Sequence, residues 1–338
     1  MTGPVYVAAT RYAIFGSMRT HALRVTAALR SIGVPVQLVT PRYYGRLKFG
    51  GAFLTTARML IRRTPADHFV HAIDVESCYR GAGVLTVHDG LVWWETSPRV
   101  REFPYRWQWA TGLRRARRIV AVSESTADRV RTLFPDVSKK IRVIPPPFET
   151  KVSDPTPKER DAIWIGRNDP PKGFVTFLEA LRDPRLATLR VLVKWTPQAR
   201  WPELTVRARE LLRRLPQVES FEGPVEYSQL ERWMAGSRCL VSTSNLEGLH
   251  AVPLEAYMFR TRIVLPRMHP YVEMYSPNAE GVHWFESGNH ADLVRAIEEA
   301  TSAPANFTPD PATLDRVSYR TVGNALLSVY REAGWQES

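Results

Sequence analysis

Two glutamates flank a turn in the stretch "STSNLEGLHAVPLEAYMFRTRIVLP", residues 242–266. Glu247 and Glu255 have seven residues between them, where an apolar strand runs into a helix. Carboxylates accept hydrogen bonds from vicinal hydroxyls, and a helix N-terminus attracts anions. The pattern therefore suits a site in which two carboxylates hold a ribose and a hexose, with amides facing a diphosphate. The alternative, which spacing alone favours, is that Glu255 only satisfies the helix dipole and Glu247 is solvated.

Two cations follow another strand, in "IGRNDPPKGF" at residues 165–174. Gly166 allows close approach of the backbone, and Arg167 and Lys172 bracket a turn before a helix. Arginine binds phosphate as a fork and lysine as a point charge, so the pair suits a diphosphate. Alone the signal is weak, because a Pro-Lys-Gly segment is often only a turn. The chain has no Walker lysine pattern and no GxGxxG.

A histidine lies beyond a third strand, in "LTVHDGLVWWE" at residues 85–95. His88 could donate to a sugar hydroxyl or stabilise developing charge, although a lone histidine at a strand end is more often structural. Four tryptophans nearby could form an acceptor platform, a core or a partner-facing patch: Trp93, Trp94, Trp107 and Trp109.

The elements that must position these residues alternate between strand and helix patterns. Apolar runs such as "VYVAAT" and "RRIVAVSES" alternate with helical periodicity, and the series restarts at "AIWIGRN" after the proline-rich linker "IPPPFETKVSDPTPKERD". The order predicts two doubly wound α/β domains, at residues 1–150 and 151–315, followed by a helix within 316–338. Ligands of such sheets bind at the carboxyl ends of the strands, so we expect the site in the cleft between the two domains.

Length and composition agree with two globular domains. The chain has 338 residues, of which 44% are hydrophobic and 24% charged. No apolar run reaches a membrane-spanning length, and the N-terminal residues lack the order of a signal peptide, so we expect a cytoplasmic protein. Cys78 and Cys239 are far apart and have no disulfide or zinc spacing, so both are predicted to be buried thiols.

Positive charge is concentrated in the first half of the chain. Residues 1–150 contain 23 Lys and Arg against 10 Asp and Glu, whereas residues 151–338 contain 23 against 24. This asymmetry indicates a surface that meets nucleic acid, a lipid headgroup or a phosphorylated substrate. A basic surface that serves only solubility is the alternative.

Taken in order, these segments resemble the retaining family 4 glycosyltransferases, which have the GT-B architecture of two facing Rossmann-like domains. The resemblance covers nearly the whole chain. "FGSMRTHALRVTAALRSIG" is similar to the family's glycine loop and first helix, and "IGRNDPPKGF" to its phosphate-binding segment. The stretch that ends in "EGLHAVPLE" resembles its E-x7-E motif, and "YRTVGNALLSVYREAG" resembles a closing helix that returns to the first domain.

The resemblance implies roles for the four charged residues. Arg167 and Lys172 match the pair that neutralises the donor diphosphate and the leaving nucleotide. Glu255 matches the glutamate that binds the ribose hydroxyls. Glu247 matches the one that contacts the transferred sugar near its reacting face, where we expect it to orient and stabilise rather than act as a nucleophile.

Four further positions match the family's site. His88 is similar in placement to a histidine that touches the sugar, and Gly16 to the loop close to the phosphates. The amides of Leu249 and His250 would complete the anion site. No metal ion or other cofactor is implied beyond the nucleotide-diphosphate sugar itself.

The implied activity is transfer of a hexose to a sugar, lipid-linked or polysaccharide acceptor. Arginines mixed with apolar residues in "RYYGRLKFGGAFLTTARMLIRR" and "GLRRARR" further suggest peripheral contact with an anionic membrane surface. Three other functions stay open: a catalytically silent scaffold or partner subunit, a sugar-nucleotide epimerase or phosphorylase, and a nucleic-acid-binding protein, for which no motif is visible.

Four residues depart from the family pattern. Arg260 and Arg262 stand where glycine and proline are usual, and Lys194 and Trp195 replace a glycine-rich strand end. We expect these changes to preserve the fold and to bear on the donor's base and sugar, or on whether the enzyme is active.

Overall fold

The structure is a computed structural model that describes residues 3–9, 16–39, 68–78, 82–88, 103–249, 251–304 and 306–337. The chain forms two compact units. The first comprises residues 1–150 and 314–338, and the second comprises residues 151–313. The C-terminal helix expected within residues 316–338 thus belongs to the first unit.

The described strands of the first unit form one parallel sheet in the order β2-β1-β3-β4-β5-β6. These strands are β1 (Val5–Ala8), β2 (Val36–Val39), β3 (Phe69–Ala72), β4 (Val84–Val87), β5 (Arg118–Ala121) and β6 (Ile141–Val143). Both β3 and β4 are buried at every residue, as expected of strands covered on both faces.

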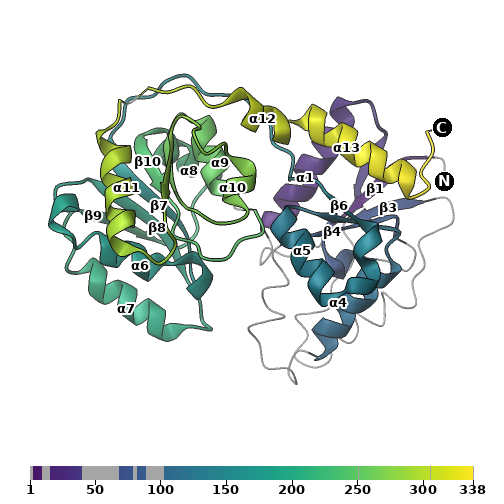
Figure 1. The fold of residues 1–338 in the computed structure, drawn as a ribbon, viewed down its shortest axis with the longest axis horizontal. Coiled ribbons are helices and arrows are strands. Elements are labelled where there is room, and N and C mark those ends of the chain that lie inside the picture. Colours follow the sequence, from purple (N-terminus) through teal and green to yellow (C-terminus); the bar gives the residue numbers. More distant parts are fainter. Residues whose placement is uncertain are drawn as a thin grey trace. The chain divides into compact units, whose positions relative to one another are not determined.

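Helices and short 3-10 turns lie between these strands: α1 (Gly16–Ser31), η2 (Val75–Ser77), α4 (Phe103–Arg115), α5 (Glu124–Leu133) and η4 (Pro135–Lys140). Near the C-terminus, α12 (Pro311–Val317) leads back from the second unit to α13 (Tyr319–Glu332) of the first. Ser123 and Ser318 cap α5 and α13, because each hydroxyl accepts a bond from a backbone amide three residues later. Figure 1 shows α13 in yellow beside α1 in purple, and the two helices pack together.

The second unit contains a parallel sheet in the order β12-β11-β10-β7-β8-β9. Its strands are β7 (Arg160–Asn168), β8 (Val191–Pro197), β9 (Val218–Glu222), β10 (Ser237–Val241), β11 (Arg262–Pro266) and β12 (Val282–Phe285). The chain builds outward from β7 through β8 and β9, and then crosses to β10 on the other side of β7. The neighbours β7 and β10 therefore form the topological switch point of this sheet.

Helices cover both faces of the second sheet: η5 (Pro170–Lys172), α6 (Phe174–Ala180), η6 (Pro184–Leu186), α7 (Pro202–Leu212), α8 (Tyr227–Ala235), α9 (Ala251–Met258), α10 (Tyr271–Met274) and α11 (His290–Ser302). The main core packs α6, α7 and α11 against alternate strand residues, and its aromatic centre is Trp164, Phe174 and Trp195. None of the residues of α8 or α9 belongs to this core, and both helices pack on β10. They therefore cover the other face.

The prediction of two doubly wound parallel-sheet units is confirmed. Cys78 and Cys239 are buried thiols as predicted, and burial raises the pKa of each to about 12. Within the described residues, no helix combines the length and the apolar character that a membrane span requires.

Candidate functional site

The candidate site lies at the carboxyl ends of β7 and β10, where the connections leave the sheet in opposite directions. Such a switch point opens a crevice between two loops, and α/β proteins bind ligands there. Arg167 is the penultimate residue of β7, Lys172 ends η5 in the loop just beyond this strand, and Glu247 lies on the loop after β10. The strand thus includes Arg167, which the sequence analysis placed after it. The two sequence segments that suggested binding chemistry are therefore neighbours in the second unit.

Gly173 shapes the first loop. Its φ of 64° lies in the left-handed region, which glycine adopts without the penalty of a Cβ. A Cβ at this position would lie 2.3 Å from the Thr243 carbonyl oxygen of the second loop. Glycine is thus required both for the turn and for the close approach of the two loops.

Hydrogen bonds tie the two loops together. Thr243 Oγ1 donates to the Gly173 carbonyl at 2.8 Å, and Asn245 N donates to the Pro171 carbonyl at 2.9 Å. Trp164 Nε1 donates to Thr243 Oγ1 at 3.1 Å from the strand beneath. The loops therefore form one supported structure on the core rather than two independent segments.

Lys172 and Glu247 form a buried ion pair across the loops. Lys172 Nζ lies 2.5 Å from Glu247 Oε1, and the two side chains are 13% and 3% exposed. A charge removed from water to this extent needs a partner, and loss of one partner leaves the other uncompensated. Each residue therefore depends on the other in the ligand-free protein. The solvated Glu247 of the alternative interpretation does not occur.

Arg167 has a different carboxylate partner. Its Nε donates to Asp169 Oδ2 at 2.9 Å, and its side chain is 51% exposed whereas that of Asp169 is 4% exposed. Burial raises the pKa of Asp169 above its usual value, although Arg167 and Lys172 oppose this shift. Asp169 Oδ1 and the neighbouring Asn168 Nδ2 are buried without a hydrogen-bond partner among the described residues. Sequence reasoning missed Asp169, because an aspartate before Pro-Pro looks like an ordinary turn residue.

Tyr271 of α10 lies beside the second loop, and sequence reasoning also missed it. Its hydroxyl is 2.9 Å from Ser242 Oγ, and its side chain is buried. Burial raises the pKa of Tyr271 well above its usual value, and the charge of Glu247 raises it further. A lone tyrosine 24 positions after Glu247 gives no motif that could have identified it.

The remaining candidates of the second unit lie on or just before α9. Glu255 is the fifth residue of this helix and thus lies beyond its first turn, where a carboxylate that satisfies the helix dipole is expected. It is 8% exposed, which does not fit a carboxylate that only answers the dipole at a solvated helix end. Leu249 is half-buried in the loop that precedes the helix, and His250 lies outside the described residues.

Two candidates belong to the first unit. Gly16 is the first residue of α1, and His88 directly follows the last residue of β4. The His88 ring meets that of His21 edge to face, with centroids 4.6 Å apart. Burial lowers the pKa of His21 well below its usual value, and the charges of His88, His71 and Arg24 lower it further. The neutral His21 was not predicted as a neighbour of His88.

The first unit matches a known protein family. The sequence model of the family Glycosyltransferase Family 4 matches residues 18–152. The match lies almost wholly within residues 1–150, so this part of the chain resembles the family. No curated protein matches the sequence significantly.

Several solved structures share the fold of this protein, and each match covers nearly the full length of both proteins. Sucrose-phosphate synthase from Thermosynechococcus elongatus is 14% identical with a TM-score of 0.70, and the match covers 97% of this chain and 98% of that one. HepE from Anabaena in complex with UDP and glucose is 13% identical with a TM-score of 0.64, covering 97% and 99%. WaaG, a glycosyltransferase involved in lipopolysaccharide biosynthesis, is 15% identical with a TM-score of 0.64, covering 97% of each. The predicted GT-B fold is confirmed, and the family match over residues 18–152 agrees with the predicted family.

The arginines that depart from the family pattern lie at the amino edge of the second sheet, opposite the candidate site. Arg260 has a φ of 54°, and its guanidinium donates to the backbone carbonyls of Ser153 at 3.0 Å and Phe307 at 2.7 Å. Arg262 donates to the Pro304 carbonyl. Both side chains therefore hold segments that cross this edge. No hydrogen bond of either side chain within the described residues reaches the loops after β7 and β10.

Lys194 and Trp195 point to opposite faces of β8. Trp195 is a core residue whose ring lies 5.3 Å from that of Phe174, the first residue of α6. Lys194 is half-buried and donates to Thr196 Oγ1 at 3.3 Å, and burial lowers its pKa. Trp195 therefore supports the helix that follows the Lys172 loop.

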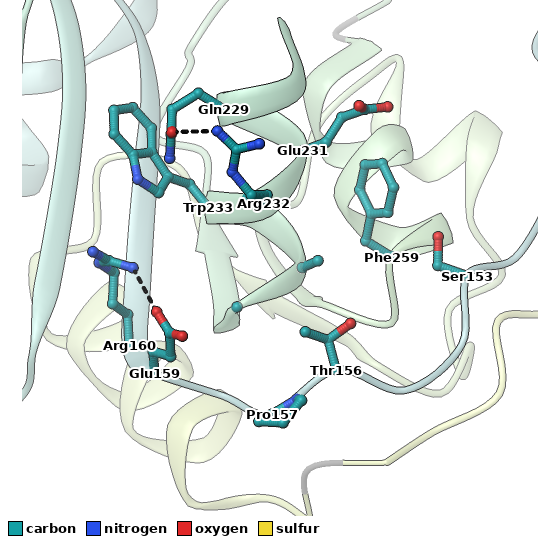
Figure 2. Close-up of a pocket in the computed structure, with 12 residues that line it drawn as sticks. Ser153, Thr156, Pro157, Glu159, Arg160, Gln229, Glu231, Arg232, Trp233 and Phe259 are labelled. Atoms are coloured by element: carbon teal, nitrogen blue, oxygen red, sulfur yellow. Dashed lines mark hydrogen bonds and ion pairs between the residues drawn. The ribbon is translucent and has the colours of Figure 1, made fainter. Parts of the chain in front are cut away.

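A pocket of about 580 Å³ also lies at the amino edge of this sheet. Figure 2 shows Arg160, at the start of β7, and Trp233 of α8 among its lining residues. Its arginines have partners already, because Arg160 pairs with Glu159 and Arg232 bonds Gln229 at 2.6 Å. None of the residues predicted for the site lines this pocket.

Proposed function

We propose that this glycosyltransferase transfers a hexose from a nucleotide-diphosphate sugar with retention of anomeric configuration. The observation that carries the proposal is the ion pair of Lys172 and Glu247 at the switch point, with Arg167 at the end of β7 beside it. Two cations suit a diphosphate, and a carboxylate beside them suits sugar hydroxyls.

Donor binding would exchange partners within the site. Without ligand, Lys172 is neutralised by Glu247 and Arg167 by Asp169. A phosphate oxygen would become the partner of Lys172, and Glu247 would then accept hydrogen bonds from hydroxyls of the hexose. Each buried charge stays compensated during this exchange, which avoids the cost of an isolated buried ion. Within the described residues, the Arg167 guanidinium forms a hydrogen bond through Nε alone, so its Nη groups could bind a second phosphate oxygen as a fork.

The reaction breaks the bond between the anomeric carbon and the donor phosphate. The electron pair of that bond moves to the phosphate oxygen, while the sugar ring gains oxocarbenium character. Arg167 and Lys172 stabilise the growing negative charge, and Glu247 orients the ring. The oxygen of the acceptor hydroxyl bonds the anomeric carbon on the face that the phosphate leaves, and the leaving phosphate accepts the hydroxyl proton. Attack on that face retains the anomeric configuration. These steps use side-chain cations and invoke no metal ion.

Other residues complete the proposed site. Glu255 binds the ribose hydroxyls, and the amides of Leu249 and His250 bind phosphate oxygens. Gly16 lets its loop approach the phosphates, and His88 contacts the sugar. These assignments rest on the match to the family's motifs.

The nucleotide is identified by a thermal-shift panel of UDP, GDP, ADP and their hexose conjugates. A ligand present at 100 times its Kd stabilises the native state by about 2.7 kcal/mol. One base should raise the Tm of the wild type and of Glu203→Gln, an exposed glutamate on α7, but not of Glu255→Gln. If no nucleotide raises the Tm, the proposal fails.

Turnover with the selected donor separates the remaining functions. Release of the nucleoside diphosphate with a glycoside of unchanged anomeric configuration, read by NMR, supports the transferase. Binding without turnover would support a silent scaffold, and an isomerised donor or a sugar phosphate would support an epimerase or a phosphorylase. Salt-sensitive binding of nucleic acid with no dependence on Glu255 would support a nucleic-acid-binding protein.

We further propose a lipid-linked or polysaccharide acceptor that this cytoplasmic enzyme reaches at an anionic membrane surface. The excess of basic residues in 1–150 supports this proposal. The segment "GLRRARR" contributes little, because Arg114 pairs with Asp136 and Arg118 with Glu332. The other basic segment, residues 42–63, lies outside the described residues. Sedimentation with phosphatidylserine vesicles at low salt tests the contact, which is ruled out if the protein stays in the supernatant.

A further inference from the structure

A tyrosine from a different connection is built into the wall of the candidate site. Tyr271 begins α10, which follows β11, whereas Glu247 lies on the loop that follows β10. The strands β10 and β11 are adjacent and parallel, so both connections start at the carboxyl edge. The side chain of Tyr271 is 2% exposed, although the next residue, Val272, is exposed. This short helix therefore turns one large polar side chain inward.

The hydroxyl of Tyr271 engages the loop that carries Glu247. It lies 2.9 Å from Ser242 Oγ, and Ser244 is a second hydrogen-bonding partner. Both serines are 2% exposed, and Glu247 follows Ser244 by three residues.

We propose that Tyr271 is a positioning residue, which fixes the loop of Ser242 and Ser244 so that the Glu247 carboxylate is held where it meets the transferred sugar. Lys172 holds this carboxylate from the loop after β7, and Tyr271 supports the loop from the side of β11. A buried carboxylate held from two sides keeps one rotamer, and such preorganisation is what a sugar-orienting group requires. The role of Glu247 in this inference rests on the proposed function.

Two tyrosine variants test the inference in the full-length protein. Tyr271→Phe removes one hydroxyl and keeps the ring. Tyr275→Phe is the matched control, because Tyr275 directly follows the same short helix and is also buried. Its ring meets that of Tyr257 edge to face, with centroids 5.6 Å apart.

The first measurement needs no activity. Amide hydrogen exchange of the ligand-free protein should become several-fold faster across residues 242–249 in Tyr271→Phe and stay at the wild-type rate in Tyr275→Phe. Equal exchange in the two variants overturns the inference whether or not the protein is a glycosyltransferase.

The second measurement places the effect on the sugar, with UDP and UDP-glucose as probes. The Kd for UDP should stay within about twofold of wild type, while the rate of glucose release from UDP-glucose falls about tenfold, as expected for a hydrogen bond lost from a catalytic loop. In a Glu247→Gln background the same change should cost less than about threefold, because Tyr271 acts through Glu247. A full tenfold loss in that background would show a merely structural role. Failure of the wild type to bind either probe counts against the proposed function with this donor, and the exchange measurement then decides the inference alone.

Discussion

Replacement of Gly173 by alanine tests how the two loops of the candidate site are held together. The added methyl has two consequences, because residue 173 is left-handed and also touches the second loop. Its φ is 64°, and the new Cβ would lie 2.3 Å from the Thr243 carbonyl oxygen. Lys172, the residue before it, carries the ammonium that meets Glu247.

The expected magnitude is the sum of a backbone effect and a steric effect. Left-handed backbone costs alanine about 1–2 kcal/mol. A contact of 2.3 Å cannot persist, so the turn must withdraw from Thr243 by about 1 Å to restore an ordinary van der Waals separation. Withdrawal weakens two hydrogen bonds, Thr243 Oγ1 to the Gly173 carbonyl and Asn245 N to the Pro171 carbonyl, each worth about 0.5–1.5 kcal/mol. We expect the free energy of unfolding to fall by about 2–5 kcal/mol.

Gly288→Ala is the matched control for the backbone effect. Gly288 has a φ of 81°, and nothing lies within 4 Å of a Cβ built on it. It should therefore lose only about 1–2 kcal/mol. Urea denaturation measures both variants, with an unchanged m-value as the condition for comparing midpoints.

The same variants should differ in function. Withdrawal of the turn moves Lys172 by about 1 Å, and a displacement of that size can reduce turnover about 100-fold. Gly288→Ala should transfer sugar at the wild-type rate. If Gly173→Ala unfolds at the same urea concentration as Gly288→Ala and keeps full activity, the steric argument is refuted and the loops are not held by this contact.

Two further predictions concern Asp169 and Arg260. Burial raises the pKa of Asp169 above 3.8, so the folded protein binds the proton of this carboxyl more tightly than the unfolded chain does. The stability that this proton contributes is present below pH 3.8 and is lost as the pH rises through the raised pKa. Protonation also removes the charged partner of Arg167, so the nucleotide Kd should rise on acidification at a higher pH than for an ordinary aspartate. This step in the pH profile should be absent in Asp169→Asn. Identical calorimetric pH profiles of the wild type and Asp169→Asn would contradict the assignment. Arg260→Gly relieves left-handed strain but removes the hydrogen bonds to the Ser153 and Phe307 carbonyls, so the free energy of unfolding should fall by about 1–3 kcal/mol. The nucleotide Kd should stay unchanged. A changed Kd would place Arg260 in the donor site.

The sequence predicts the two loops of the candidate site because the order of strands and helices determines where they lie. Alternating strand and helix patterns require parallel sheets, and right-handed crossovers leave few arrangements of strands. Arg167 lies at the carboxyl end of one strand and Glu247 follows another, so both had to reach the same edge of one sheet. The position of Arg260 follows from the same rule, since it precedes β11 and must lie at the opposite edge.

The partners within the site could not be predicted in this way. Lys172 meets Glu247, and Arg167 meets Asp169, because Gly173 and Thr243 bring the two turns into contact. Nothing in the sequence separates these pairings from the exchanged ones. Tyr271 likewise shows no pattern, because its hydroxyl reaches the site only after β10 and β11 are paired.

The sequence by itself determined the doubly wound architecture, the family resemblance and the strand ends that carry the charged residues. Periodicity and local turn chemistry act over a few residues, so they can be read along the chain. Only the tertiary structure decided which charges are buried, which carboxylate neutralises each cation and which tyrosine supports the Glu247 loop. These properties depend on distances between residues that are separated by up to 75 positions, as in the pair of Lys172 and Glu247, and such distances are set by packing rather than by local preference.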